Sequence, residues 1–398
     1  MRDVVIVEGC RSAFGKMGGG LKKLSASELA SFVVKGLTER TKLLEKTKLD
    51  GVFAGTAFSD CQTNTPGRYT VLDAVLPIEV PGTTVEMQCG SAISAINLAA
   101  CKIACGMADA IIAGGMESHS TRYAKFSMCT EPYRLIPPAA IPNKLAVDPA
   151  QNGSMIANND LMAKTWNISR EECDEYALRS QQLMGAAIAS GFTGEEIVPK
   201  VFPATKKSTE IVIDKDEHPR PDTTREQLQK LRPIFKDGIT TAGNASGLND
   251  GAAFVLLMSA EKAKELGYVP YARWLGGADA GCRPDLMGIG ASYSTLKALN
   301  MLGLKLADID VFECNEAFAA QNLCVIKDME NSTGEKIDRA KWNPNGGAIA
   351  IGHPNGASGG RIAIFAMRQL ALNGGRYGVF TSCCGGGQGV TAVIENLR

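Results

Sequence analysis

Cys89, in the run Gln88-Cys89-Gly90-Ser91, has the sequence setting of a nucleophile. It follows residues 83–85, which predict a short strand, and it opens a predicted helix of small and apolar residues that reaches Gly106. A helix begins with unpaired backbone N–H groups at the positive end of its dipole, so this position favours the thiolate over the thiol. The alternative is a small core cysteine, which is the commoner fate of a lone one. Two segments near the C-terminus favour the nucleophile.

The first of these segments contains His353, in Gly352-His353-Pro354-Asn355-Gly356-Ala357-Ser358-Gly359-Gly360. A cysteine nucleophile generally needs an imidazole base, and the chain has only three histidines. His218 lies in a charged loop beside two prolines and is expected at the surface, while His119 is expected to serve local structure. We therefore expect His353 to activate Cys89 and later to polarise a carbonyl. The glycine run alone could also be a tight turn or a phosphate cradle, although it lacks the Lys-Ser/Thr ending of a P-loop.

The second of these segments contains Cys383, and together with a further segment at Asn315 it could supply the remaining groups of a catalytic site. Cys383 precedes Cys384 and the glycines 385–387, at the end of a predicted strand over 377–381. Glycines after a strand expose backbone N–H groups that can bind an oxyanion, and a cysteine beside them can act as a second acid or base. Asn315 begins the run Asn-Glu-Ala-Phe-Ala at the end of another predicted strand. An amide there can orient a water or donate to a carbonyl oxygen.

The elements that must position these residues occur twice along the chain. In each half, a helix, a strand, a glycine turn, a second helix, a second strand and a second glycine turn follow one another. This alternation predicts an α/β fold with largely parallel or mixed sheets, and the duplication predicts two similar halves packed together. The segments are helix 26–37, strand 51–55, the helix after Cys89 and strand 108–113, and then helix 294–302, strand 310–313, helix 357–372 and strand 377–381.

Between the halves lies a region of different composition, roughly residues 120–242. It contains a proline cluster, a strongly helical stretch over 170–190, and short charged segments. We expect an insertion that covers the active site, which is a usual place for function to be carried. Most of its cations are expected on a solvated surface, and a few could contact a ligand phosphate. These cations are Lys206, Lys207, Lys215, Arg220, Arg225, Lys230 and Arg232.

Composition excludes several classes of function. The 398 residues are too many for one ordinary core, so two or three domains are expected. Lys plus Arg and Asp plus Glu both number 42, which gives no indication of nucleic acid or a membrane surface as a partner. The first apolar run, residues 4–7, is too short for a signal peptide, and no stretch is long enough to span a bilayer. The C-terminus carries no peroxisomal or prenylation signal, so we expect a cytoplasmic protein.

The twelve cysteines do not predict a disulfide framework, because the chain is large and shows no secretion signal. A zinc site is also not expected, since there are three histidines and no C-x-x-C pair. Most of the thiols are therefore expected to be reduced and inert.

Taken together, the segments at Cys89, Asn315, His353 and Cys383 resemble those of the thiolases, enzymes that make or cleave 3-ketoacyl-CoA. Two more segments, 243–251 and 11–15, are similar to family patterns, and the resemblance runs end to end in the right order. It implies a five-layered α/β/α/β/α fold of two pseudo-equivalent halves with an inserted loop domain. The implied domains are residues 1–119 with 243–268, the CoA-binding loop domain 120–242, and residues 269–398.

The resemblance also implies a role for each candidate residue. Cys89 takes up the acyl group as a thioester, His353 activates it, and Cys383 exchanges the α-proton of the second substrate. Asn315, through a water, and His353 form one oxyanion hole, and the backbone N–H groups of Cys89 and Gly385 form the other. The implied CoA contacts are Ser246, Arg220, Phe235 and Met155, and Met287 and Phe318 are expected in the acyl pocket.

The implied activity is the reversible condensation of two acetyl-CoA molecules to acetoacetyl-CoA and CoA, without a cofactor, by a homodimer or homotetramer. Departures from the family pattern at Glu86 and Ala92, and the absence of a histidine in 152–156, bear on chain length. A broad-range 3-ketoacyl-CoA thiolase of fatty-acid β-oxidation is the alternative. A ketoacyl synthase, a cysteine hydrolase and a non-catalytic acyl-CoA-binding protein are less favoured, because Cys383 has no place in the first two and all four catalytic residues are present.

Overall fold

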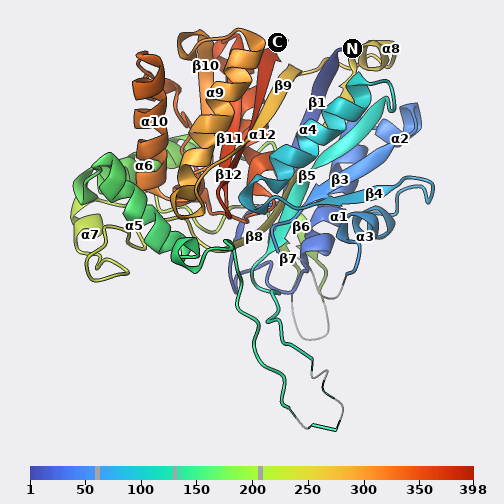
Figure 1. Ribbon diagram of the computed structural model, residues 1–398. Helices are drawn as coiled ribbons and strands as arrows, with labels where there is room; N and C mark the ends of the chain where they lie inside the picture. Colours follow the sequence, from blue (N-terminus) through green and yellow to red (C-terminus); the bar gives the residue numbers. More distant parts are fainter. Residues whose placement is uncertain (59–62, 129–130, 132, 135, 205–208) are drawn as a thin grey trace.

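One long mixed sheet runs through the computed structural model, which describes residues 1–58, 63–128, 131, 133–134, 136–204 and 209–398 (Figure 1). Its strands follow the order β10-β11-β12-β9-β1-β8-β5-β3-β4, and the short β2 (Gly15–Lys16) pairs with β8. The strands are β1 (Val4–Arg11), β3 (Gly51–Gly55), β4 (Gly82–Val85), β5 (Ala110–Ser118), β8 (Asn249–Ser259), β9 (Ala272–Gly281), β10 (Ile309–Cys314), β11 (Tyr377–Cys384) and β12 (Gln388–Asn396).

The sheet consists of two halves with the same sequence of strand directions. From β1 through β8 and β5 to β3 the pairings are antiparallel, antiparallel and parallel, and from β9 through β12 and β11 to β10 they repeat that order. A short antiparallel seam, Val4–Ile6 with Ala272–Trp274, joins the halves. The predicted duplication is therefore confirmed.

Two helices fill the layer between the halves. Helix α4 (Ser91–Ala104) contacts β3, β5 and β8, α12 (Ser358–Asn373) contacts β10 and β11, and the two helices contact each other. Close approach requires small side chains, and a Cβ on Gly359 would lie 2.8 Å from the backbone nitrogen of Ile93. The small-residue composition that predicted a helix after Cys89 is thus the composition that this central layer needs.

Other helices cover the outer faces, which completes five layers (Figure 1). Helices α1 (Ala26–Thr41), α2 (Leu43–Lys46) and α3 (Pro66–Asp73) lie with the first half, and α9 (Gly290–Leu302) and α10 (Ala319–Thr333) lie with the second. Ser25 and Glu28 form a capping box that begins α1, as expected for this sequence pattern. The remaining short helices are α8 (Ala260–Glu265) and α11 (Ala348–Ile351).

The inserted region packs mainly on the second half. Helices α5 (Met155–Trp166) and α6 (Arg170–Ala189) contact α10, and α7 (Arg225–Gln229) contacts α6. Strands β6 (Lys200–Phe202) and β7 (Ile211–Ile213) form a separate ribbon. Residues 121–128 and 136–147 extend away from the body, as Figure 1 shows. Within the described part of the chain, the structure has no helix whose length and apolar character would suit a membrane crossing.

One predicted boundary differs in a way that matters for the site. The strand predicted over 377–381 continues to Cys384, because its antiparallel partner β12 extends the pairing to Cys384 with Gln388. Cys383 and Cys384 therefore belong to a strand, in which neighbouring side chains point to opposite faces.

Candidate active site

A strained turn presents Cys89. The residue lies in a single turn of 3-10 helix, Gln88–Gly90, between β4 and α4. Gln88 has a φ of 49°, which is the left-handed region that a side chain disfavours. The Glu86 carboxylate holds it there by accepting from the Gln88 backbone N–H at 3.0 Å and from its side-chain amide at 2.9 Å. The departure from the family pattern at Glu86 thus supports the turn that carries the thiol.

Three N–H groups surround the sulfur of Cys89. The Asn355 side-chain amide donates to Sγ at 3.2 Å, and the backbone N–H groups of Cys89 and Gly385 also act on it and lower its pKa. Burial has the larger effect, and with the nearby Glu117 it raises the thiol pKa to about 11. The backbone N–H groups at the helix start thus favour the thiolate as expected, but burial outweighs them. Cys89 stays protonated until a base takes its proton.

His353 is fixed by both its backbone and its ring. Gly352 has a φ of 104°, and the following His353 N–H donates to the Asn249 side-chain oxygen at 3.0 Å. Ser358 Oγ donates to the Pro354 carbonyl at 3.2 Å and lies 2.6 Å from His353 Nδ1. Because the Ser358 hydroxyl donates its proton to Pro354, its oxygen accepts a hydrogen bond from His353 Nδ1–H. Nε2 is then the unprotonated nitrogen and can accept a proton.

Burial keeps the His353 imidazole neutral. Burial, with smaller contributions from the neighbouring His119 and the Arg361 charge, lowers the pKa of His353 to about 3. Within the described residues no hydrogen bond joins His353 to Cys89, and the side chain that donates to Sγ is Asn355. His353 and Cys89 nevertheless line one cavity.

Asn315 lies beside His353. Its side-chain nitrogen is 3.4 Å from His353 Nε2, and its side-chain oxygen is buried without a hydrogen-bond partner among the described residues. A buried acceptor of this kind favours a bound water, which can donate to it. The neighbouring Glu316 ties the segments together, because its carboxylate accepts from groups of three different regions. These donors are Tyr176 and Ser180 of α6, Asn343, and the backbone of Ile349.

The two adjacent cysteines of β11 face opposite ways. Cys383 lines the cavity with Cys89, whereas Cys384 packs in the cluster around the central helices, where a Cβ on Gly90 would be 2.5 Å from its sulfur. Burial raises the pKa of Cys383 well above its ordinary value, and the nearby Cys89 adds to this rise. The resting Cys383 is therefore also a thiol.

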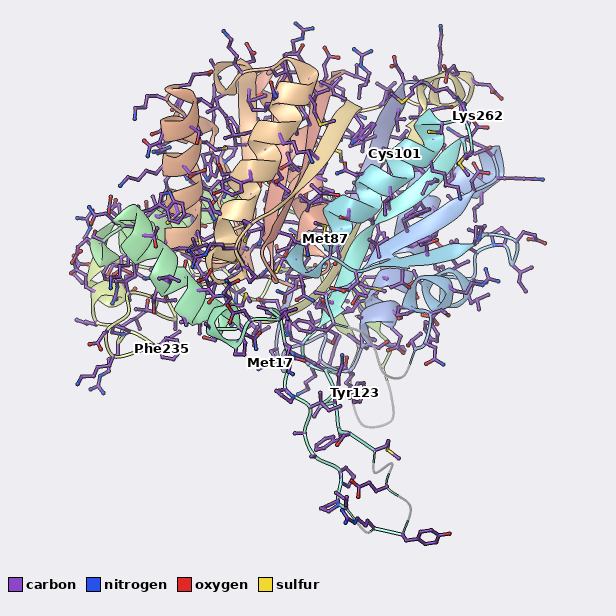
Figure 2. The ribbon with its side chains drawn as sticks, in the orientation of Figure 1. Met17, Met87, Cys101, Tyr123, Phe235 and Lys262 are labelled. Atoms are coloured by element: carbon purple, nitrogen blue, oxygen red, sulfur yellow. The ribbon has the colours of Figure 1, made fainter. Side chains whose placement is uncertain are left out.

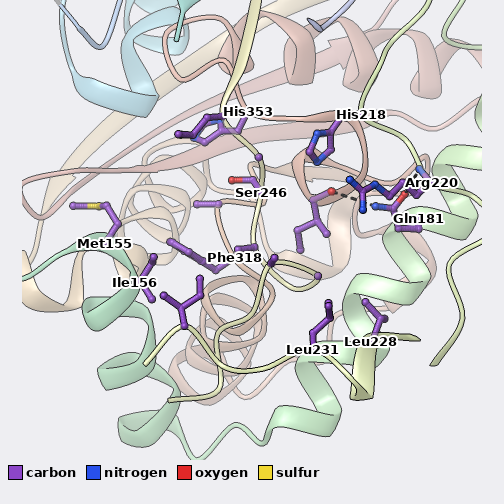
Figure 3. Close-up of a pocket in the computed structure, with 18 of the residues that line it drawn as sticks. Met155, Ile156, Gln181, His218, Arg220, Leu228, Leu231, Ser246, Phe318 and His353 are labelled. Atoms are coloured by element: carbon purple, nitrogen blue, oxygen red, sulfur yellow. Dashed lines mark hydrogen bonds between the residues drawn. The ribbon is translucent and has the colours of Figure 1, made fainter. Parts of the chain in front are cut away.

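The cavity has a volume of about 1090 Å³, which is large enough for a long ligand (Figure 3). Met155, Met287 and Phe318 form part of its apolar lining, and Figure 3 shows Arg220 and Gln181 on the opposite side from Met155. Ser246 lies between these sides, and its backbone N–H donates to the Ala317 carbonyl at 3.0 Å. Short bridges from Ala245 to Phe318 and from Leu248 to His353 hold this segment across the site.

Two residues lie elsewhere than the sequence predicted, and two others lie outside the described part of the chain. Phe235 is 45% exposed on the outer surface and is not part of the described cavity wall, since the loop turns its ring outward (Figure 2). His218, expected at the surface, lines the cavity, and burial lowers its pKa to about 4. Lys206 and Lys207 lie outside the described residues.

Sequence reasoning missed Asn355. It stands at the variable position of the Gly-His-Pro-x-Gly pattern, so the motif gives no signal for it. Its contact with Cys89 joins residues 266 positions apart, which no local pattern encodes. Among the described residues, no group of three His, Cys, Asp or Glu side chains could hold a metal ion.

Comparison with known proteins finds relatives along the whole chain. The family model of the thiolase N-terminal domain matches residues 4–261, and that of the thiolase C-terminal domain matches residues 268–396. A beta-ketoadipyl-CoA thiolase of Pseudomonas knackmussii is 42% identical over 411 residues, covering 100% of both chains. An acetyl-CoA acetyltransferase of Allochromatium vinosum is 41% identical over 400 residues, covering 99% of both. The crystal structure of the Bacillus anthracis acetyl-CoA acetyltransferase has a TM-score of 0.92 at 38% identity, covering 100% of this chain and 99% of that one.

Proposed function

The chain belongs to the thiolase family of acyl-CoA acyltransferases, and on this basis we propose that it interconverts two acetyl-CoA molecules with acetoacetyl-CoA and CoA. The observation that supports the proposal is the convergence of Cys89, His353 and Cys383 at one cavity, with the buried Asn315 against His353. These residues come from four separate segments, and together they provide a nucleophile, two acid–base groups and donors for two oxyanions.

In the first half-reaction, Cys89 becomes acylated. The neutral His353 Nε2 takes the thiol proton as sulfur attacks the carbonyl carbon of acetyl-CoA. The bond from that carbon to the CoA sulfur breaks, and the CoA thiolate receives the proton from His353. The acyl oxygen is stabilised by the backbone N–H groups of Cys89 and Gly385, both of which act on Sγ in the resting site.

In the second half-reaction, a second acetyl-CoA becomes the nucleophile. His353 Nε2 takes the proton of the Cys383 thiol, and the Cys383 thiolate then accepts the α-proton of this acetyl-CoA. The enolate oxygen is stabilised by the protonated Nε2–H of His353 and by a water on Asn315. The enolate carbon attacks the acyl carbon, the bond from that carbon to the Cys89 sulfur breaks, and His353 returns its proton to the Cys89 thiolate, which leaves both cysteines as thiols. The burial that raises the pKa of Cys383 makes its thiolate a strong base once formed.

We further propose that residues 120–242 form the CoA-binding loop domain, between a first half of residues 1–119 with 243–268 and a second half of residues 269–398. Arg220 supports this assignment, because it lines the cavity and can contact a CoA phosphate. Ser246 and Met155 line the same cavity as Arg220 and Cys89. Phe235, exposed outside the described cavity wall, is retained only as a contact for the outer end of CoA.

The apolar lining favours a short, uncharged acyl group. Met287 and Phe318 are 2% and 8% exposed, and their bulk limits the depth available to an acyl chain. The similar beta-ketoadipyl-CoA thiolase is named for a substrate whose acyl chain carries a carboxylate. A carboxylate beside Met155, Met287 and Phe318 would be desolvated without a cation, since Arg220 lies on the opposite side from Met155 (Figure 3).

Two measurements test this function. Incubation with acetyl-CoA should add an acetyl mass to the Cys89 peptide, and Cys89→Ser should abolish most turnover, because an alkoxide is far harder to generate than a thiolate.

A kcat/KM series should rank acetoacetyl-CoA above 3-ketoadipyl-CoA and 3-ketodecanoyl-CoA. Discrimination by methylene count is weak, about 0.8 kcal/mol per buried CH₂, so slightly longer chains should react measurably. A preference for 3-ketodecanoyl-CoA would establish the broad-range thiolase instead.

A further inference from the structure

A chain of two hydrogen bonds links a second histidine to the sulfur of Cys89. His119 Nε2 lies 2.6 Å from the Asn355 side-chain oxygen, and the Asn355 side-chain nitrogen donates to Cys89 Sγ at 3.2 Å. His119 follows the end of β5, Asn355 lies between α11 and α12, and Cys89 precedes α4. Three distant segments thus meet at the reacting atom, on contacts separate from those that hold His353.

His119 is buried and firmly placed. It is 6% exposed, and its ring packs edge to face on Phe58 with centroids 5.5 Å apart. Burial lowers the pKa of His119, while the hydrogen bond to Asn355 raises it by less; the charge of Arg122 lowers it and that of Asp250 raises it. The buried His353 is the other titratable ring that interacts with it. His119 is therefore neutral at physiological pH, with one ring nitrogen protonated.

The orientation of the Asn355 amide decides which atom the sulfur meets. An amide carries an acceptor at one end and two donors at the other. With Nε2 protonated, His119 donates to the Asn355 oxygen, and the amide nitrogen is then the end that faces Sγ. The reversed amide would place its oxygen against the sulfur and disfavour the thiolate.

We propose that Asn355 is a catalytic residue that stabilises the Cys89 thiolate through its amide N–H, and that His119 is the positioning residue that fixes the amide in this orientation. The inference rests on the proposed role of Cys89 as the nucleophile. No proton moves through the two hydrogen bonds that join His119, Asn355 and Cys89. Asn355 keeps its hydrogens, and His353 takes the proton of Cys89. The stabilisation acts when the thiol is deprotonated and again when Cys89 leaves the acyl carbon.

Asn355→Leu tests the donor, because leucine has a similar size and no N–H. Alkylation by iodoacetamide, followed on the Cys89 peptide well below the thiol pKa, reports the thiolate fraction. We expect a rise of about one unit in the Cys89 pKa, which lowers the thiolate fraction about tenfold. Higher basicity raises intrinsic nucleophilicity, so the net alkylation rate should fall about threefold. Thiolysis of acetoacetyl-CoA should lose about threefold in kcat with KM unchanged, because the same balance of thiolate fraction and nucleophilicity applies to attack on the substrate.

The matched control is Asn345→Leu. The Asn345 side-chain amide donates to the Gln369 side-chain oxygen at 2.8 Å, and Asn345 does not line the cavity. This substitution should leave the Cys89 alkylation rate and kcat at wild-type values. Equal alkylation rates and equal kcat in wild type and Asn355→Leu would overturn the proposal. If the wild type shows no acetyl mass on Cys89, the proposed function fails instead, and the alkylation comparison still decides the role of Asn355.

A pair of His119 variants decides the case if Asn355→Leu fails to fold. His119→Gln retains a side-chain N–H that can donate to the Asn355 oxygen, whereas His119→Leu removes it. We expect His119→Leu to slow Cys89 alkylation and lower kcat several-fold, and His119→Gln to restore both toward wild type. Equal effects of the two substitutions, with equal melting temperatures, would assign His119 a packing role and overturn the positioning role.

Discussion

At the scale of single residues, burial determines the acid–base state of the resting site. It raises the pKa of Cys89 to about 11 and lowers that of His353 to about 3, so both groups are neutral near pH 7. To form a thiolate–imidazolium pair, both groups would have to become charged in surroundings of low polarity, which burial disfavours. Proton transfer from Cys89 to His353 therefore belongs to the substrate-bound state, in which a developing oxyanion and a leaving thiolate change the local charge.

This neutrality predicts the pH dependence of the free thiol. Alkylation of Cys89 should rise steadily with pH from neutral to alkaline values, because its thiolate forms only as the pH approaches a pKa of about 11. The measurement is the alkylation rate of the Cys89 peptide against pH without substrate. A plateau beginning near neutral pH would reveal a preformed thiolate–imidazolium pair and contradict the prediction.

The opposite faces of Cys383 and Cys384 predict a clear difference between their variants. Cys383→Ala should still acylate Cys89 but should lose exchange of the acetyl-CoA α-proton, because the cavity-lining thiol is gone. Cys384→Ala should retain most activity and lose about 1–2 kcal/mol of stability through a small core cavity. Isotope exchange from deuterated water, acyl mass and thermal melting measure these effects. The reverse ranking of the two variants would contradict the assignment.

At the scale of the elements, tight turns set the positions of Cys89 and His353, whereas strand β11 carries Cys383. Gln88 adopts a left-handed conformation before Cys89, and Gly352 does so before His353. Both turns are held by side chains from the site itself, Glu86 in the first case and Asn249 in the second. These two turns direct Cys89 and His353 into the cavity.

Gly352→Ala should therefore damage both stability and catalysis. Its φ of 104° disfavours a side chain, and a Cβ would lie 2.4 Å from the Asn249 side chain that holds the His353 backbone. Backbone strain of this kind costs about 1–3 kcal/mol, and kcat should fall as His353 shifts. Gly303→Ala is the control, because Gly303 has a φ of 68° with open space around it at the end of α9. It should lower the melting temperature while kcat stays at the wild-type value, and equal kcat in both variants would contradict the prediction.

At the scale of the whole molecule, the site lies where the two halves and the inserted region meet. The first half contributes Cys89, the second contributes His353, Asn315 and Cys383, and the insertion contributes Arg220 and Met155. Separation of the halves would part Cys89, the proposed nucleophile, from its proposed acid–base partners. Packing of α4 against α12 is therefore as necessary for the chemistry as any single catalytic residue.

The extended residues after β5 bear on the oligomeric state. Tyr123, Phe126 and Met128 are 43%, 55% and 81% exposed, which is unusual for side chains of this size. We expect this chain to form a homodimer or homotetramer, in which such side chains become covered. Light scattering coupled to size-exclusion chromatography measures the mass, and Phe126→Asp should reduce it or weaken the association. A monomer in the wild type at micromolar concentration would contradict this expectation.

The sequence by itself determined the family, the duplicated α/β plan and the segments that contain Cys89, Asn315, His353 and Cys383. These features are readable because each depends on local order: strand, glycine turn and helix are encoded by neighbouring residues. The extension of β11 to Cys384 was not readable in this way, since it depends on pairing with β12.

Only the tertiary structure decided how these segments act on one another. It brought Asn355 to Cys89 across 266 positions, turned Phe235 outward, placed His218 in the cavity wall, and made burial outweigh the helix start in setting the thiol pKa. The physical reason is that desolvation and long-range hydrogen bonds depend on which segments pack together. A run of neighbouring residues does not contain that information.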